Sequence, residues 1–528
     1  ERGGKFILVD PRRTESALYA SEHLFIKPGT DPLFIYGLIQ YIIQQKLYDT
    51  AHLTPILDGF DHLLGMFDQF SLVDISDVCG ISEDNIKRIA TDFAAAEGAI
   101  CYGRMGLSTQ NFSALNHWLV NILNIITGNL DRKGGMMFTK PAVDMGVKAS
   151  TAGSFARYHS RVRGLPEFSR ELPTAILAEE MLTPGEGQVK GFICTAGNPV
   201  LSVPNGRQLD EALENLDFMV SIDFYLNETS RHADIILPPT GPLEHEHYDL
   251  VFNLLAVRNV AKYSEALFEH AEDERSDFDI MTGLMQRINK LKRGLVDTSK
   301  QPKMTTEQIL DYSLRNGPYG KSFTSYESGK EINHDYGLSL EVLKQYPHGL
   351  DLGPLQPCLP EYLFTKDKLI HLLPDPILDD FQKMKAHFSS ETHKSLMMIS
   401  RRDLRTNNSW MHNSQRLIKG KDRCALLIHP EDAKETGVAD RGQAILKSRV
   451  GELKVNVLIS EDVMRGVVCL PHGWGHDREG IALRVAQTNP GVSMNDLTDD
   501  QRVDSMSGNA IFNGVPVEIT PLFHSTDE

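Results

Sequence analysis

GGKFILVDPRRTESALYASEHLFIKPGTD, residues 3–31, is the stretch that decides the fold of the first part of the chain. Residues 5–9, KFILV, form an apolar run without polar alternation, which is typical of a strand buried on both faces of a parallel sheet. The sequence DPRR at residues 10–13 ends that strand, because proline cannot donate to the ladder. Ligands of open α/β sheets bind beyond the carboxyl ends of strands. We therefore expect the acid to accept hydrogen bonds from a nucleotide and the arginines to bind phosphate.

Short apolar runs that end on polar turns recur along the chain. Residues 27–31, KPGTD, add a second turn with an acid, and a further strand is expected at residues 99–103. Residues 192–199, FICTAGNP, end on a turn where glycine permits close approach and asparagine offers a donor and an acceptor. Residues 218–222, FMVSI, end on Asp223. These turns are where an α/β sheet binds its ligand.

Length and composition indicate a protein of several domains with an ordinary core. The chain has 528 residues, of which 41% are hydrophobic and 24% charged, and its net charge is -17. That charge disfavours nucleic acid and anionic membrane surfaces as partners. The six cysteines are widely spaced and include no CxxC, which indicates free thiols in a reducing compartment and neither a disulfide framework nor a zinc or iron–sulfur site. No run approaches the roughly 20 apolar residues of a membrane span. We expect a cytoplasmic protein, with the periplasm as the open alternative.

Five phrases of the chain identify a family. They are VDPRRTESA at 9–17, IKPGTD at 26–31, TGNLDRKGG at 127–135, ADIILP at 233–238 and HPEDAKETGVADRGQAILKSRVGELKVNV at 429–457. Together they resemble the molybdopterin oxidoreductases of the dimethyl sulfoxide reductase family, which includes formate dehydrogenases and nitrate reductases. The resemblance implies molybdenum or tungsten held between two molybdopterin guanine dinucleotides.

The resemblance also implies a fold. We expect an α/β protein with Rossmann-like parallel-sheet domains and a C-terminal double-psi β-barrel. Residues 1–140 are predicted to bind one guanine dinucleotide, and residues 141–289 to form a second α/β domain with a crossover loop. Residues 290–392, which many prolines interrupt, are predicted to be connecting and surface structure. Residues 393–528 are predicted to form the barrel, which binds the molybdopterin dinucleotides.

Cofactor contacts are implied for the turns after the strands and for a polar arm after the first barrel strand. That arm, residues 400–413, holds arginines, asparagines and a tryptophan, which suit a segment laid across pyrophosphate and pterin. The residues implied are Asp10, Pro11, Arg12, Arg13, Thr14, Gly29, Thr30, Asp31, Met105, Gly106, Gln110, Gly197, Asn198, Pro199, Ile222, Asp223, His245, Asp277, Ser400, Arg401, Arg402, Thr406, Asn408, Trp410, His412, His472 and Asn495.

The catalytic candidates come from a run of alternating basic side chains at residues 157–163. One interpretation is a basic funnel for an anionic substrate or a clamp on pterin phosphate, and the other is a solvated or interdomain charge cluster. We name His159, Arg161 and Arg163 as candidates under the first interpretation. No residue of this chain is predicted to bind the metal.

The chain begins with Glu1, within what the family would make a mid-domain helix end. We therefore expect the metal ligand and a [4Fe-4S] cluster to lie in an N-terminal part that this sequence lacks, and this chain alone to be inactive. The expected partners are a small-molecule substrate and an electron-transfer protein or subunit.

The predicted function is oxygen-atom transfer, or hydride and electron transfer, on a small substrate such as formate or nitrate. One alternative is a non-catalytic relative, such as the large subunit of a complex-I-type enzyme, that keeps the fold without the metal. The other is an ordinary Rossmann dinucleotide enzyme, against which the absence of GxGxxG after a predicted strand counts.

Overall fold

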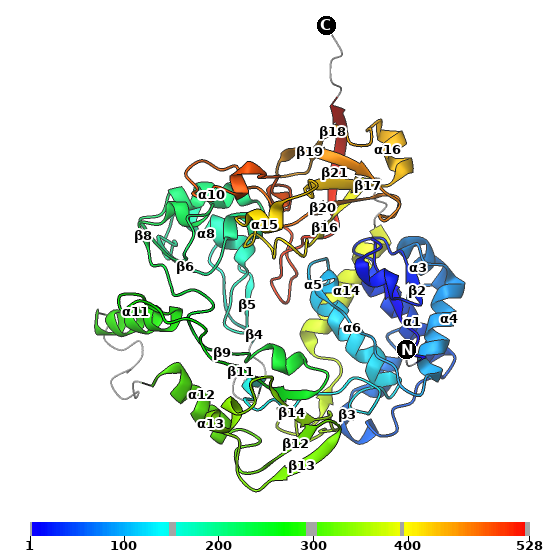
Figure 1. The fold of residues 1–528 in the computed structure, drawn as a ribbon. Helices are drawn as coiled ribbons and strands as arrows, with labels where there is room; N and C mark the ends of the chain where they lie inside the picture. The colour runs from blue at the N-terminus through cyan, green and yellow to red at the C-terminus, as the bar shows by residue number, and fades with distance from the viewer. Residues whose placement is uncertain (1–2, 147–154, 292–303, 391–394, 523–528) are drawn as a thin grey trace.

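The computed structural model describes residues 3–146, 155–291, 304–390 and 395–522. These residues pack into four regions (Figure 1): a helical region near the N-terminus, a small parallel sheet with its helices, a region of hairpins and helices, and a barrel near the C-terminus. The barrel contacts both of the first two regions.

The first region buries the apolar helix α1 among other helices and aromatic rings. Tyr36 of α1 lies against Phe67 and Phe381, and Trp118 of α6 stacks on Phe67. Strands β1 and β2 pair in parallel beside this core, so the strand predicted for residues 5–9 is present. The expected burial on both faces is wrong, because the sheet has only two strands: Phe6 is exposed and Ile7–Val9 are partly buried. The elements are β1 (Ile7–Val9), β2 (Glu22–Leu24), α1 (Asp31–Gln44), β3 (Leu57–Asp58), α2 (Phe60–Leu64), α3 (Leu72–Cys79), α4 (Glu83–Ala95), α5 (Met105–Ser108) and α6 (Ser113–Ile126).

Residues 99–103 do not form the strand that their apolar character predicts. The side chain of Asn124 accepts from the Cys101 amide and donates to the Cys101 carbonyl, both at 2.9 Å. Asn129 accepts from the Ala99 amide at 3.0 Å. Two side-chain amides therefore satisfy this backbone in the place of a neighbouring strand.

The second region contains a three-stranded parallel sheet, which confirms the Rossmann-like prediction for this part of the chain. Strand β7 lies in the centre between β6 and β8. Leu209 and Leu213 of α10 pack on the sheet because they fall on one face of the helix. The elements are β4 (Phe155–His159), β5 (Pro166–Phe168), α8 (Leu177–Leu182), β6 (Gly191–Thr195), α9 (Pro199–Ser202), α10 (Gly206–Glu214), β7 (Phe218–Ile222) and β8 (Ile235–Ile236).

Residues 304–390 differ from the connecting and surface structure that their prolines predict. Strand β14 pairs with β10, and helix α14 places Phe381 and Met384, both fully buried, in the core of the first region. The prolines of this range stand between elements, apart from Pro376 in the first turn of α14, where proline is tolerated, and they leave the apolar faces intact. The elements from residue 247 onwards are β9 (His247–Tyr248), β10 (Asn259–Ala261), β11 (Tyr263–Ser264), α11 (Asp277–Leu291), α12 (Thr306–Arg315), β12 (Phe323–Glu327), β13 (Lys330–His334), α13 (Leu340–Lys344), β14 (Leu350–Gly353), β15 (Ile370–His371) and α14 (Asp375–Ser390).

The C-terminal region is a closed six-stranded barrel in the order β16-β20-β17-β19-β18-β21, which confirms the predicted barrel. The pairs β16–β20 and β17–β19 are parallel and the other neighbours are antiparallel. The polar arm follows β16. The elements are β16 (Leu396–Arg401), α15 (Gln415–Ile418), β17 (Ala425–Ile428), α16 (Pro430–Thr436), β18 (Gln443–Lys447), β19 (Glu452–Ile459), β20 (Val467–Pro471) and β21 (Val515–Leu522).

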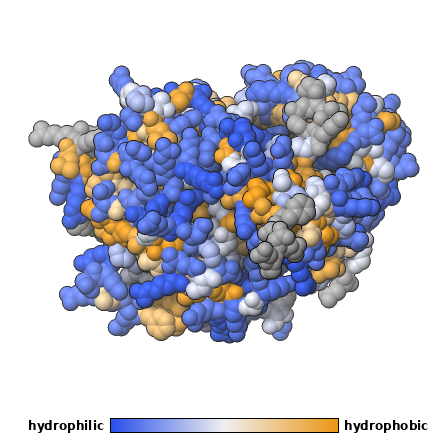
Figure 2. Space-filling model, turned by 90° about the horizontal axis from the view of Figure 1, so that it is seen from above, coloured by the Kyte–Doolittle hydropathy of each residue, from blue (hydrophilic) through white to orange (hydrophobic). Residues whose placement is uncertain are grey.

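The face seen from above is largely covered by hydrophilic side chains, with apolar side chains gathered in smaller groups between them (Figure 2). None of the helices within the described ranges combines the length and the apolar character that crossing a membrane requires.

Candidate cofactor-binding site

A partly open pocket lies where the second region meets the polar arm of the barrel. Asp223, at the end of β7, and Asn198, at the start of α9, form one wall, and Trp410 and Asn413 of the arm form the other. The carboxyl ends of β6 and β7 thus face the pocket, as the position of ligands in α/β sheets predicts. The lining residues are Gly197, Asn198, Asp223, Tyr225, Asn227, Ser409, Trp410, Asn413 and Leu483.

Asp223 is held in a fixed orientation and is only 3% exposed. Its Oδ1 accepts from the Tyr225 amide at 3.0 Å and its Oδ2 from Asn227 Nδ2 at 2.9 Å. Burial raises the pKa of the carboxyl group, these donors oppose the rise, and the charge of Asp277 adds to it. Each carboxylate oxygen keeps a further lone pair, so the group remains able to accept N–H groups of a ligand.

Asn198 is part of a hydrogen-bonded chain that crosses from the second region into the barrel. Its Nδ2 donates to Glu228 Oε2 at 2.7 Å, and its Oδ1 accepts from Thr229 Oγ1 at 2.8 Å. The other oxygen of Glu228, Oε1, lies 2.8 Å from Nδ1 of His476, on the loop after β20. Glu228 and His476 are both fully buried.

The rings of His412, Trp474 and His476 lie together next to the hydrogen bonds of Asn198 and Glu228, and some of their nitrogen atoms have no hydrogen-bond partner among the described residues. The His412 ring lies 4.4 Å from the Trp474 ring and 4.5 Å from the His476 ring. Among the described residues, neither nitrogen of His412 has a hydrogen-bond partner, and the same holds for Trp474 Nε1 and His476 Nε2. Burial, with the neighbouring His476, lowers the pKa of His412 to about 3. A neutral imidazole is therefore available as both a donor and an acceptor.

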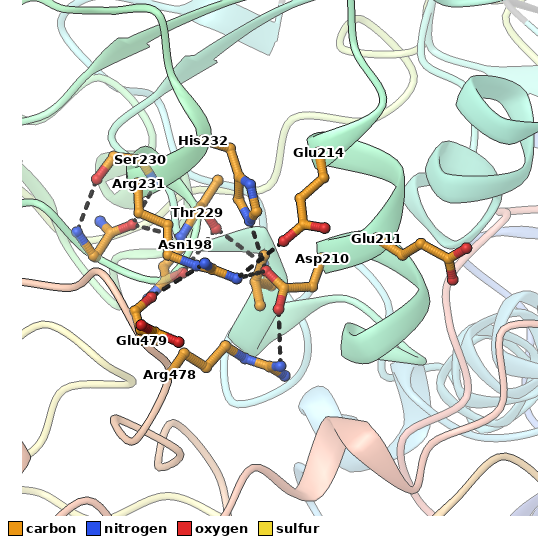
Figure 3. A network of polar contacts seen from close by, with 12 residues as sticks. Asn198, Asp210, Glu211, Glu214, Thr229, Ser230, Arg231, His232, Arg478 and Glu479 are labelled. Atoms are coloured by element: carbon orange, nitrogen blue, oxygen red, sulfur yellow. Dashed lines mark hydrogen bonds and ion pairs between the residues drawn. The ribbon is translucent and has the colours of Figure 1, made fainter.

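A network of ion pairs fastens the same loops from outside the pocket (Figure 3). Asp210 of α10 accepts from Arg231 at 2.7 Å, His232 at 2.7 Å and Arg478 at 3.0 Å. Arg478 also pairs with Asp496 at 3.0 Å. Burial would raise the pKa of Asp210, but these three partners outweigh burial and lower it. The network ties the loop of Asn227–Arg231 to the barrel loop that carries His476.

The first region has a similar group of polar residues at the end of β1, formed by Asp10, Arg12, Gly29, Asp31 and Gln110. We call this group the first half-site and the pocket at Asp223 the second half-site. Asp10 Oδ1 accepts from the Arg12 amide at 2.8 Å, which is the same turn geometry as that of Asp223 with Tyr225. Burial raises the pKa of Asp10, and Arg12 opposes the rise. Burial also raises the pKa of Asp31 to about 6, although the Gln110 side chain lowers it. Gln110 accepts from the Gly29 amide at 2.9 Å, so three predicted turns meet here.

The barrel holds this half-site by main-chain contacts. The Arg13 amide donates to the Asp462 carbonyl at 2.7 Å, and the Met464 amide donates to the Pro11 carbonyl at 3.1 Å. The amide of Asn513 donates to the Thr109 carbonyl at 3.0 Å.

Ser400, at the end of β16, is linked to the first half-site through Asn513. Its Oγ donates to Asn513 Oδ1 at 3.1 Å, and Asn513 Nδ2 donates to Thr109 Oγ1 at 2.7 Å. Burial raises the pKa of the Cys469 thiol in β20, and the charges of Arg401 and Arg12 act on the same thiol. The Met464 amide, just before β20, donates to the Pro11 carbonyl, and Arg401 pairs with Pro471 of β20, so the DPRR turn and the root of the polar arm both contact the segment around β20.

Several residues of the arm and its neighbours serve the fold by their visible contacts. Arg401 donates to the carbonyls of Arg423 and Ala425, and Thr406 Oγ1 donates to the Asp403 carbonyl. Burial and the charge of Arg402 lower the pKa of His472 to about 4. Their cofactor contacts remain predictions.

Other predicted contact residues have different surroundings. Asn495 is fully buried, donates to the Leu201 carbonyl at 2.6 Å and accepts from Thr498. His245 Nδ1 lies 3.0 Å from the Glu246 carbonyl, in a loop after β8. Met105 is 54% exposed at the start of α5, and no side chain lies against Gly106.

The catalytic candidates lie on and after β4. Arg161 pairs with Glu180 at 3.1 Å, and Arg163 pairs with Glu179 at 2.6 Å and donates to the Asp500 carbonyl at 3.0 Å. His159 is exposed in β4. These contacts favour the structural interpretation for the two arginines, and a catalytic role of the three residues stays a prediction.

Sequence reasoning missed part of the pocket. Tyr225 and Asn227 follow Asp223 by two and four residues. An asparagine four residues after the acid is the feature of the sequence from which their place in the pocket could have been predicted. Asn413 stands in the polar arm and shares its composition. Glu228 gave no signal, because its partner His476 lies 248 residues away.

The hydrogen-bonding groups and the aromatic ring of the pocket suit a nucleotide base. The pocket offers carboxylate and amide oxygens for base N–H groups and aromatic surface for stacking, and four buried ring nitrogens beside it have no partner within the part of the chain that the structure describes. A ligand that donates and accepts hydrogen bonds would satisfy them. Within the described ranges, no cluster of three or more histidine, cysteine, aspartate or glutamate side chains could hold a metal ion.

Comparison with known proteins gives the family. Residues 1–287 match the family described as Molybdopterin oxidoreductase, and residues 396–516 match the Molydopterin dinucleotide binding domain. The chain belongs to the molybdopterin oxidoreductase family. This match confirms the resemblance to the dimethyl sulfoxide reductase family and a dinucleotide cofactor of the molybdopterin type.

Three relatives of the chain are oxidoreductases by name. The assimilatory nitrate reductase catalytic subunit of Bacillus subtilis is 25% identical over 94% of this chain and 70% of its own length. The dimethyl sulfoxide/trimethylamine N-oxide reductase of Rhodobacter capsulatus is 22% identical over 93% of this chain and 63% of its own length. The F420-dependent formate dehydrogenase subunit alpha of Methanocaldococcus jannaschii is 24% identical over 95% of this chain and 70% of its own length.

A solved structure agrees on the fold. Acetylene hydratase from Pelobacter acetylenicus superposes with a TM-score of 0.74 and 18% identity, over 99% of this chain and 74% of that chain. The named relatives give no support to the alternative of a non-catalytic complex-I-type subunit. The match to the molybdopterin oxidoreductase family also argues against the alternative of an ordinary Rossmann dinucleotide enzyme.

Proposed function

We propose that this chain is the large part of an oxidoreductase that binds molybdenum or tungsten as a bis-molybdopterin guanine dinucleotide. The reaction is oxygen-atom transfer, or hydride and electron transfer, on a small substrate such as formate or nitrate. The names of the nitrate reductase and formate dehydrogenase relatives support this substrate class.

One observation carries the proposal. Asp10 and Asp223 each follow a strand of a parallel pair, and each accepts the amide of the residue two positions later on Oδ1. Both lie where the barrel contacts their region. Two equivalent carboxylates at one barrel are what a cofactor with two guanines requires, since a carboxylate can accept two N–H groups from a guanine edge.

The chain's own residues bind, orient and desolvate such a cofactor. The carboxylates of Asp10 and Asp223 accept base N–H groups, and Arg12 and Arg13 donate to phosphate. The buried rings of His412 and Trp474 offer donors in a place from which water is excluded. When bound, the metal and its pterins supply the redox chemistry, and the protein supplies position and electrostatics.

Further partners belong to the same proposal. A [4Fe-4S] cluster and an electron-transfer protein or subunit would carry electrons to or from the metal, and the name of the formate dehydrogenase subunit alpha supports a partner subunit. His159, which is exposed in β4, is proposed to meet the anionic substrate, and Arg161 and Arg163 are proposed to position this segment through their ion pairs with Glu180 and Glu179.

The test is the cofactor content of the full-length enzyme carrying Asp223→Ala. Wild type is expected to hold about two guanine nucleotides for each metal atom. The variant loses a carboxylate that accepts base N–H groups, so its metal and guanine contents are expected to fall together. Asp217→Ala is the control, because Asp217 is 68% exposed just before β7. Unchanged metal and guanine contents in Asp223→Ala would reject the proposal for this pocket.

A further inference from the structure

Glu228 is a buried acid whose contacts span two regions of the molecule. It is fully buried between β7 and β8, and its two oxygens face different partners. Oε2 accepts from Asn198 Nδ2 at 2.7 Å, and Oε1 lies 2.8 Å from His476 Nδ1 on the barrel. A buried carboxylate without partners is costly, so this arrangement requires both donors.

The acid determines which way the Asn198 amide points. An amide group has nearly the same shape after a half-turn, so its hydrogen bonds alone decide its orientation. The carboxylate of Glu228 can only accept, which draws Nδ2 towards it. Thr229 Oγ1 then donates to Oδ1 at 2.8 Å and completes the arrangement, which Figure 3 shows in part.

The amide orientation matters because Asn198 lines the pocket beside Asp223. One N–H of Nδ2 and one lone pair of Oδ1 remain for a ligand. A reversed amide would exchange a donor for an acceptor at the same place. The pattern that a purine base meets would then change without any change in pocket shape.

We infer that Glu228 is a positioning residue for the nucleotide pocket, because it fixes the orientation of the Asn198 amide. Its contact with His476 of the barrel holds Glu228 itself in place. The inference rests on the proposed function, and it deepens it by assigning the choice between purine bases to a residue outside the pocket lining. The ligand class is a guanine nucleotide held through its diphosphate-linked base.

The test measures binding of guanosine, inosine and adenosine diphosphates to the full-length enzyme prepared without cofactor, by titration calorimetry. While His476 donates from Nδ1, as it does to the carboxylate, the single side-chain oxygen of Glu228→Gln has to serve both His476 and Asn198, so the Asn198 amide reverses or loses its partner. The affinity for guanosine diphosphate is expected to fall about tenfold, which corresponds to one unsatisfied polar group. The ratio of guanosine to inosine and adenosine diphosphate affinity is expected to change as well.

Glu211→Gln is the matched control. Glu211 is exposed on α10, and its side chain points away from the network (Figure 3). The same chemical change there is expected to leave all three affinities within twofold of wild type.

The double variant Asn198→Asp with Glu228→Gln separates positioning from stability. The new amide at position 228 donates to the new carboxylate at position 198 and still accepts from His476, and the net charge of the pair is unchanged. Thermal stability is expected to return to within a few degrees of wild type. The base preference is not expected to return, because the pocket has lost the amide of Asn198. This variant also answers the question if Glu228→Gln alone fails to fold.

The outcomes separate the two ideas. A wild-type protein that binds none of the three diphosphates overturns the proposed function of the pocket. A wild-type protein that binds guanosine diphosphate, beside a Glu228→Gln variant with equal affinity and preference, overturns the positioning role alone. A double variant that regains both stability and preference also overturns it, since Glu228 would then be only structural.

Discussion

The barrel holds the first half-site mainly through main-chain contacts, whereas at the second half-site it adds ion pairs to main-chain contacts such as that of the Ala482 amide with the Leu226 carbonyl at 2.9 Å. At the first, the Arg13 and Met464 amides donate to carbonyls across the contact, and the Asn513 amide donates to Thr109. At the second, Arg478 of the barrel meets Asp210, and His476 meets Glu228. The two halves share the turn at Asp10 and Asp223, so the difference lies in the docking and not in the acids.

This difference determines how each half responds to mutation and pH. Main-chain hydrogen bonds persist when a side chain is exchanged, since every residue except proline has the donor. Buried charges depend on each partner, because removal of one leaves the other uncompensated. The second half-site should therefore be the more sensitive to single substitutions, and the first should respond mainly through its buried acids.

The largest expected effect comes from Asp210→Asn, which removes the charge shared by Arg231, His232 and Arg478. Breaking such a buried pair costs about 3 kcal/mol of the free energy of unfolding. Urea unfolding measures the loss. Hydrogen exchange should locate it in β6–β8 and the loop after β20, with α1 and α6 still protected.

Asp217→Asn is the control for that loss. Asp217 pairs with Lys190 at 3.6 Å, with both side chains more than 60% exposed, and such a pair is worth about 0–1 kcal/mol. Equal losses in the two variants, or loss of protection spread evenly over both halves, would remove the distinction between the two kinds of docking.

The half-sites themselves were largely predictable from sequence because each depends on a local pattern. An apolar run followed by DPRR, and FMVSI followed by Asp223, place an acid at the end of a parallel strand. The barrel was predictable for the same reason, since its strands are short apolar runs between polar turns. Within the second half-site, Asn198 and Asp223 were found in this way, and the structure places both in the pocket.

The docking was not predictable, because it joins residues that no local pattern connects. Glu228 and His476 are 248 residues apart, and Asp210 and Arg478 are 268 apart. The strand expected at residues 99–103 failed for a related reason, since side chains of Asn124 and Asn129 satisfy its backbone from a helix and a turn. Apolar character predicts burial there and says nothing of the partner.

A smaller effect is expected from pH at the first half-site. Burial raises the pKa of Asp31 to about 6, from 3.8, so the folded state binds more protons than the unfolded state between these values. The contribution of Asp31 to the free energy of unfolding should therefore fall as the pH rises from about 4 to 6, and stay level above. Because Asp31 is partly exposed, water screens part of the penalty, and we expect about 1–2 kcal/mol.

Asp31→Asn isolates this titration. The variant should lack the fall between pH 4 and 6 and gain on wild type over that interval, as measured by urea unfolding at fixed ionic strength. A wild-type curve parallel to that of the variant would show that Asp31 titrates normally. The first half-site would then have no pH response that can be assigned to Asp31.

The smallest effect concerns two histidine–aspartate pairs of nearly equal length. His371 Nδ1 lies 2.8 Å from Asp58 in the first region, and His232 Nε2 lies 2.7 Å from Asp210 in the second. The side chains of the first pair are 45% and 57% exposed, and those of the second 5% and 14%.

The hydrogen bond to Asp58 raises the pKa of His371. The contribution of His371 to the free energy of unfolding is therefore complete below pH 6.5 and is lost as the pH rises through the folded-state pKa. Relative to His371→Gln, wild type should gain less than about 1 kcal/mol at pH 6 and nothing at pH 9. A gain as large as the loss in Asp210→Asn would mean that burial does not decide the strength of these pairs, and the two halves would then differ only in the number of their charges.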